Sequence, residues 1–148
     1  MPPRLIVIDT QCLFDWLLFQ NPRCEAWSEA LARPDWKWVF TSSMRGEFEF
    51  VLAKGIGDGR WPVRGDVISH AWTALAHELA TPEPLGASVQ LRCTDPDDQK
   101  FIDLAIAASA HTLVTRDKAL LKLARRAAGR HGVRVCKPEV WSAEISAT

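Results

Sequence analysis

Residues 95–121, with the sequence DPDDQKFIDLAIAASAHTLVTRDKALL, constrain the possible fold more than any other part of the chain. A helix is predicted there because apolar side chains recur at the three- and four-residue steps of one helical face, namely Phe101, Leu104, Ala105 and Ala108. The short apolar run at 112–115 then predicts a buried strand. Asp97 and Asp98 therefore fall at the start of a helix, and Asp117 falls just after a strand. That end of a strand is where open α/β sheets bind ligands.

These acidic residues also have a second explanation. Asp is a preferred N-cap residue, and the helix dipole favours acidic side chains in the first turn. Capping alone would account for Asp97 and Asp98, and equally for Asp9, which follows the apolar run at 5–8 and precedes a predicted helix. The local sequence around each residue leaves both explanations open.

The order of the predicted elements indicates the fold class. Apolar or alternating runs predict strands at residues 5–8, 36–40, 89–91, 112–115 and 133–135. Helical spacing of apolar residues predicts helices between them, including 64–79 and 119–128. This alternation favours an α/β fold, specifically a three-layer α/β/α sandwich around a mainly parallel central sheet. A length of 148 residues suits a single domain spanning residues 1–148.

Glu47 is unusual within its predicted helix. The helix follows Ser42 or Ser43, and its apolar stripe consists of Met44, Phe48, Val51 and Leu52. Glu47 lies along the margin of this stripe, whereas Glu49 points away from it. Because an unpaired charge at the edge of a core is costly, Glu47 needs a partner. A metal ion or an arginine such as Arg45 would satisfy it.

Composition bounds the location and the chemistry. The longest apolar run near the start, residues 5–8, is too short for a signal peptide or a membrane span, so we expect a cytoplasmic protein that does not enter the membrane. The four cysteines lack zinc-ligand spacing and are expected to be reduced, partly buried thiols. Charges sum to zero, but residues 116–137 hold eight basic side chains and one acidic one. This run fits either contact with a polyanion or a solvated helix face.

Segments along nearly the whole chain resemble a PIN domain, in particular the toxin-like branch of VapC-type proteins. They are LIVIDTQCL, TSSMRGEFEFVL, DPDDQKFIDLAIAASAHTLVTRDKALL and VRVCKPEVW. The resemblance implies an α/β/α sandwich and a metal-dependent nuclease. Many such proteins are endoribonucleases that pair with an antitoxin protein and are often dimeric.

The resemblance also implies four acidic site residues. The family's first position, after the opening strand, falls on Asp9, and the second, inside a helix, falls on Glu47. The third is best matched by Asp98, with its neighbour Asp97 as the alternative. The fourth is Asp117. All four carboxylates are therefore present.

Two positions depart from the family pattern and put the positioning of the substrate in doubt. The family usually shows Asn where this chain has Gln11, and often Gly where it has Arg116. Thr115 is expected to be a hydrogen-bonding neighbour of the acidic site. For contact with substrate phosphate, the candidates are Arg116, Lys118 and Arg45.

Oxygen-only ligands suit Mg²⁺ or Mn²⁺. We expect Asp9 and Asp117 to be direct metal ligands, with Asp98 and Glu47 binding the metal or orienting the attacking water, and Asp98 as the third metal-binding residue. The expected function is a metal-dependent endoribonuclease, the toxin of a toxin-antitoxin pair, with RNA, a cognate antitoxin and a second copy of the chain as partners. The leading alternative is a non-catalytic PIN-fold module that binds RNA or protein. A small phosphatase-like hydrolase is disfavoured because no nucleophile motif is evident.

Overall fold

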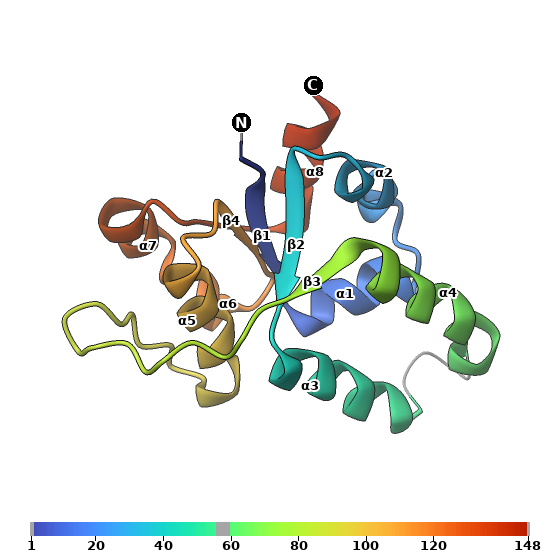
Figure 1. Ribbon diagram of the computed structural model, residues 1–148, viewed down its shortest axis with the longest axis horizontal. Coiled ribbons are helices and arrows are strands. Elements are labelled where there is room, and N and C mark those ends of the chain that lie inside the picture. The colour runs from blue at the N-terminus through green and yellow to red at the C-terminus, as the bar shows by residue number, and fades with distance from the viewer. Residues whose placement is uncertain (1, 56–59, 148) are drawn as a thin grey trace.

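The computed structural model describes residues 2–55 and 60–147, with the side chains of residues 60–63 excluded. Its strands form one parallel sheet in the order β3-β2-β1-β4-β5 (Figure 1). The strands are β1 (Arg4–Ile8), β2 (Trp36–Phe40), β3 (Ala76–Glu78), β4 (Thr112–Val114) and β5 (Arg134–Cys136). In the central register, Ile6 lies between Trp38 and Thr112. The residues at the carboxyl ends of β1 and β4 are fully buried, as expected for the middle of a parallel sheet.

Within the described residues, eight α-helices flank this sheet. They are α1 (Thr10–Leu17), α2 (Trp27–Ala32), α3 (Ser42–Ala53), α4 (Arg60–Leu75), α5 (Gln99–Ala107), α6 (Lys118–Leu121), α7 (Ala124–His131) and α8 (Pro138–Ser146). Figure 1 shows α1, α2 and α4 on one side of the sheet and α5, α6 and α7 on the other. This arrangement confirms the predicted α/β/α sandwich, and the sheet is parallel throughout.

The sheet contains a topological switch point between β1 and β4. From β1 the chain adds β2 and then β3 on one side, and it later adds β4 and β5 on the other side. The loops after β1 and β4 therefore diverge, and ligands bind in the crevice that such loops open. Asp9 begins the first of these loops and Asp117 ends the second.

Tryptophan side chains fill much of the core. Trp27, Trp38 and Trp141 are fully buried. The ring of Trp141 on α8 meets the edge of Trp27, at 5.1 Å between centroids, and that of Trp36, at 5.5 Å. The last helix is therefore held against α2 and β2 by aromatic contacts.

The structure corrects the predicted element boundaries at three places. The helix predicted at 64–79 ends at Leu75, and the next three residues form β3, which pairs with β2. The sequence did not predict β3, because a strand of three residues is too short to show alternation of apolar and polar side chains. The predicted strand at 89–91 is wrong: Leu91 is buried by packing, without a strand partner. The helix predicted at 119–128 is divided into α6 and α7. Gly132, with a φ of 66°, caps the carboxyl end of α7.

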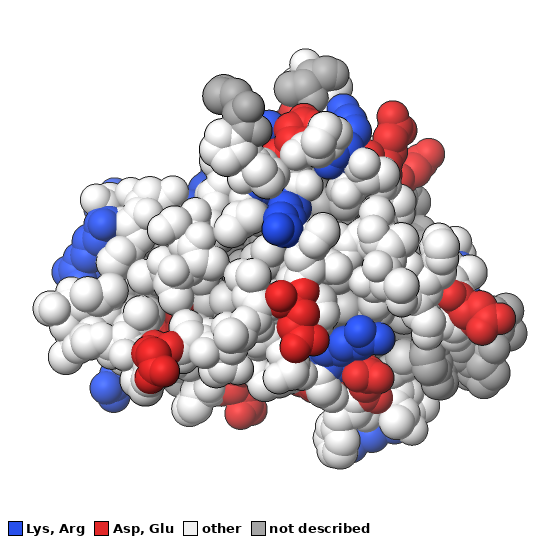
Figure 2. All heavy atoms as spheres, viewed as in Figure 1, with Lys and Arg blue, Asp and Glu red and all other residues white. Residues whose placement is uncertain are grey.

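The surface features agree with an ordinary globular chain. Figure 2 shows acidic and basic side chains scattered over the face in view without one continuous patch of either sign. On α7, Arg125, Arg126 and Arg130 are exposed while Ala127 is buried, so this part of the basic run forms a solvated helix face. All four cysteines are buried free thiols. None of the described helices combines the length and apolar character that crossing a membrane requires.

We predict that Trp141→Ala lowers the free energy of unfolding by about 3–5 kcal/mol, because it leaves a large cavity between α8, α2 and β2. Val140→Ala on the same helix is the matched control, since Val140 is 41% exposed, and it should stay within about 0.5 kcal/mol of the parent. Urea denaturation followed by tryptophan fluorescence measures both. Equal effects of the two substitutions would contradict the packing role of Trp141.

Candidate metal centre

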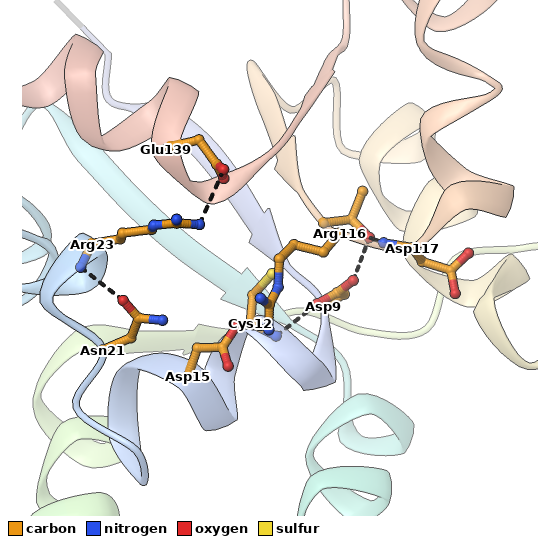
Figure 3. A network of polar contacts seen from close by, with 9 residues as sticks. Asp9, Cys12, Asp15, Asn21, Arg23, Arg116, Asp117 and Glu139 are labelled. Atoms are coloured by element: carbon orange, nitrogen blue, oxygen red, sulfur yellow. Dashed lines mark hydrogen bonds and ion pairs between the residues drawn. The ribbon is translucent and has the colours of Figure 1, made fainter.

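Asp9 lies at the end of β1 and is buried, with 4% of its surface exposed. One carboxylate oxygen accepts a hydrogen bond from the backbone N–H of Cys12 at 2.9 Å, which caps α1. The other accepts a hydrogen bond from the Thr115 hydroxyl after β4. Asp9 is therefore both a helix cap and a link between two neighbouring strand ends, as Figure 3 shows.

Asp117 is tied to the same network through Thr115. The backbone N–H of Asp117 donates to the Thr115 hydroxyl oxygen at 2.9 Å. Its Oδ1 accepts from the backbone N–H groups of Ala119 at 2.7 Å and Leu120 at 3.3 Å, which caps α6. The predicted hydrogen-bonding role of Thr115 is thus observed, and Thr115 itself is fully buried.

The short 3₁₀ turn η2 (Pro96–Asp98) brings further carboxylates to Asp117. Asp95, Asp98 and Asp117 each place one carboxylate oxygen within 4.8 Å of the others. Asp98 makes no capping hydrogen bond from its side chain, although it occupies the N-cap position of α5. Asp97 is exposed and lies outside this cluster. The geometry therefore favours Asp98 over Asp97 as the third acidic residue.

Glu47 on α3 has two partners contributed by other helices. One carboxylate oxygen accepts from the Thr10 hydroxyl of α1, and the other lies 3.1 Å from Nζ of Lys100 on α5. The predicted partner Arg45 instead pairs with Glu49 at 3.7 Å, so that part of the prediction is wrong. Glu47 is fixed in orientation because both of its oxygens are engaged.

The four acidic side chains expected from sequence line one cavity of about 520 Å³. Its other walls are polar and apolar side chains: Thr10, Gln11, Phe14, Val51, Phe101 and Arg116. The cavity lies where α1, α3 and α5 meet the carboxyl ends of β1 and β4. Asp9 on its wall is hydrogen-bonded to Thr115, a residue 106 positions away in the sequence.

Mutual repulsion and burial perturb these carboxylates. The pKa of Asp98 is raised to about 7, first by burial and next by its hydrogen bond with Asp117 and the charge of Asp117. The charges of Asp95 and Asp9 raise this pKa further. Burial also raises the pKa of Asp9, against the lowering effect of its hydrogen bonds from Thr115 and Cys12.

This donor set fits a hard divalent cation. The three clustered side chains offer only carboxylate oxygens, the ligands that Mg²⁺ and Mn²⁺ prefer. A cation bound there would offset the repulsion that raises the pKa of Asp98. Asp95 was not predicted as a site residue, although its spacing of three from Asp98 was a signal in the sequence.

The three residues predicted to contact substrate phosphate differ in whether they line the cavity and in their ion-pair partners. Arg116 lines the cavity and forms an ion pair with Asp15 of α1. Lys118 is exposed and does not line the cavity, and Arg45 is engaged by Glu49. Only Arg116 therefore stands where a substrate bound at the carboxylates would meet it.

A family model described as PIN domain matches residues 5–119. The matched region contains every carboxylate of the cavity, and the chain belongs to the PIN domain family. Among solved structures, the crystal structure of PAE2754 from Pyrobaculum aerophilum is similar, with a TM-score of 0.64 and 18% sequence identity over 98% of this chain and 91% of that chain. This likeness supports the fold. No curated protein matches the sequence significantly.

We predict that Asp98→Asn raises the melting temperature of the metal-free protein, because it removes one charge from a repelling cluster. The same substitution should abolish the increase that saturating Mg²⁺ or Mn²⁺ gives the parent, roughly 5–10 °C at a hundred times the dissociation constant. Asp97→Asn should change neither quantity. Differential scanning calorimetry with a chelator and with each ion measures both, and identical behaviour of the two variants would exclude Asp98 from the ion site.

The raised pKa of Asp98 predicts a pH dependence of stability. Between its ordinary value of 3.8 and about 7, the folded protein retains a proton that the unfolded chain releases. The free energy of unfolding of the metal-free protein should therefore fall as pH rises through this window. Urea denaturation at a series of pH values measures the fall. It should be smaller in Asp98→Asn, and an unchanged slope in that variant would contradict the assignment.

Proposed function

We propose that this PIN domain is a metal-dependent endoribonuclease. The observation that carries the proposal is the convergence of Asp95, Asp98 and Asp117 within 4.8 Å at the switch point of the sheet, in a region bounded by buried Asp9 and by Glu47. Structural ion pairs do not explain this cluster, since its members are all acidic. Membership of the PIN domain family supports nuclease chemistry.

We assign the ion to Asp9, Asp98 and Asp117, with Asp95 as an additional ligand. A bound Mg²⁺ or Mn²⁺ would lower the pKa of water and stabilise negative charge on the phosphodiester and its leaving oxygen. Thr115 holds Asp9 and the backbone of Asp117 in a fixed relation, which keeps the ligands preorganised.

Glu47 is assigned to orienting the water that attacks the phosphodiester. Its two oxygens are held by Thr10 and Lys100, so the side chain keeps one direction at the cavity edge. In-line attack requires such an orientation. The side chains of Phe14 and Phe101 contribute apolar surface to the cavity walls.

The substrate we propose is RNA, cleaved within the chain, and the physiological role is that of a VapC-like toxin. In this role a cognate antitoxin protein would restrain the nuclease, and the active form would be a homodimer in the cytoplasm. The support for these finer assignments is the resemblance of the four sequence segments to VapC-type proteins.

A second candidate is a PIN-fold module that binds RNA or protein without cleaving it. The ion pair between Lys100 and Glu47 favours it, because a side-chain cation here occupies a carboxylate that would otherwise be free for the reaction. Retained RNA affinity without metal-dependent cleavage would identify this function.

We predict that purified protein cleaves RNA with Mg²⁺ or Mn²⁺ and not with a chelator. Asp9→Asn and Asp117→Asn should each lower the rate at least about 100-fold, because they weaken the ion site. Asn is also a good N-cap residue, so the helices that these residues begin should remain stable. Gel analysis of labelled RNA measures the cleavage.

The matched comparison lies on α3. Glu47→Gln should lower the rate strongly, whereas Glu49→Gln, on the exposed face of the same helix, should leave it unchanged. If Asp9→Asn and Asp117→Asn cleave RNA as well as the parent does, the proposed site is wrong.

A further inference from the structure

Arg116 is the one cationic side chain among the described residues that line the cavity. It belongs to the loop after β4, between Thr115 and Asp117, both of which take part in the acidic site. An arginine in this place has nearby carboxylates on several sides. Arg116 forms its ion pair, however, with Asp15 on α1.

Asp15 is a buried acid outside the ion site, and it does not line the cavity. Burial raises its pKa, while the charge of Arg116, a hydrogen bond from Gln11 and the charge of Arg23 lower it. A buried carboxylate without a partner is costly, so Asp15 favours the ion pair with Arg116. The same ion pair holds the guanidinium group in one position. Figure 3 shows the side chain of Arg116 running from the end of β4 toward Asp15.

This pairing directs the guanidinium group of Arg116 to Asp15 instead of to Asp9, Asp98 or Asp117. If the guanidinium group were free to turn, it would pair with Asp9, Asp98 or Asp117 and compete with a divalent ion for them. Asp15 engages Nη2 of Arg116, and the arginine side chain remains 39% exposed. A guanidinium group carries five N–H donors, so one carboxylate partner leaves donors for a second anion.

We propose that Arg116 is a substrate-binding residue that donates hydrogen bonds to a phosphate of the RNA, and that Asp15 is a positioning residue that holds Arg116 away from the metal ligands. This inference rests on the proposed nuclease function. The carboxylates of the cavity repel the negatively charged RNA. The positive charge of Arg116 beside them reduces this repulsion for the RNA phosphate that enters the cavity. The fixed, planar guanidinium group suits a phosphate better than a mobile ammonium group does.

The first experiment tests Arg116. Arg116→Ala should raise KM for a fluorescein-labelled single-stranded RNA of mixed sequence by about tenfold or more, with a smaller change in kcat. It should also reduce the slope of log affinity against log salt by about 0.7, the value for one lost phosphate contact on a single strand. Arg116→Lys should recover part of the affinity. Arg126→Ala is the matched control, since Arg126 is exposed on α7 and does not line the cavity.

The second experiment tests Asp15. Asp15→Asn should raise the Mg²⁺ concentration needed for half-maximal thermal stabilisation, because the released Arg116 competes with the ion. The double variant Asp15→Asn with Arg116→Ala should restore the parent's requirement. A purely structural role of Asp15 predicts no such restoration, and an Mg²⁺ requirement that stays high in the double variant would overturn the positioning role.

The binding measurement separates this inference from the nuclease proposal. If the parent does not cleave RNA, fluorescence anisotropy with Ca²⁺ still reports affinity for the same labelled RNA. Weaker binding by Arg116→Ala, with Arg126→Ala unchanged, would then support the contact while the nuclease proposal fails. Equal KM, affinity and salt slope in Arg116→Ala and the parent would overturn the role of Arg116, whether or not the protein cleaves RNA.

Discussion

The buried carboxylate of Asp9 is the constraint on which the rest of the site depends. A charge with 4% exposure needs its hydrogen bonds, and they come from the first turn of α1 and from Thr115 after β4. Thr115 in turn accepts the backbone N–H of Asp117. A hydrogen bond tolerates little change in distance. The hydrogen bonds of the Asp9 carboxylate therefore fix the end of β1 relative to the end of β4, and with them the positions of Asp9 and Asp117.

Helix capping by an acidic side chain leaves room for the proposed ion binding in this protein. Asp9 and Asp117 each cap a helix, as their local sequence indicated. Asp117 uses only Oδ1 in capping, and carboxylate oxygens have lone pairs for more than one partner. Asp98, which caps nothing with its side chain, has the pKa raised to about 7. The cluster therefore reduces the stability of the metal-free fold, and the same repulsion favours a bound cation.

Two ion pairs keep basic side chains at the edges of the acidic cavity. Lys100 pairs with Glu47 on one wall, and Arg116 pairs with Asp15 beside the other. Neither cation pairs with Asp98 or with its neighbours in the carboxylate cluster. Gln11 and Arg116, the two residues that the resemblance marked as departures from the expected pattern, both interact with Asp15. This acid of α1 therefore interacts with both of these residues.

Sequence determined what local periodicity and residue type encode. Four strands, most helices, the layered α/β/α class and the acidic positions followed from spacing and from the resemblance, because side-chain alternation and capping act over a few residues. Tertiary structure decided β3, the position of Asp95 beside Asp98, and every partner that lies far away in the sequence. The contacts from Thr10 to Glu47, Lys100 to Glu47 and Thr115 to Asp9 join residues 37, 53 and 106 positions apart. Such partners are chosen by packing of the whole sheet and its helices, which no short stretch of sequence contains.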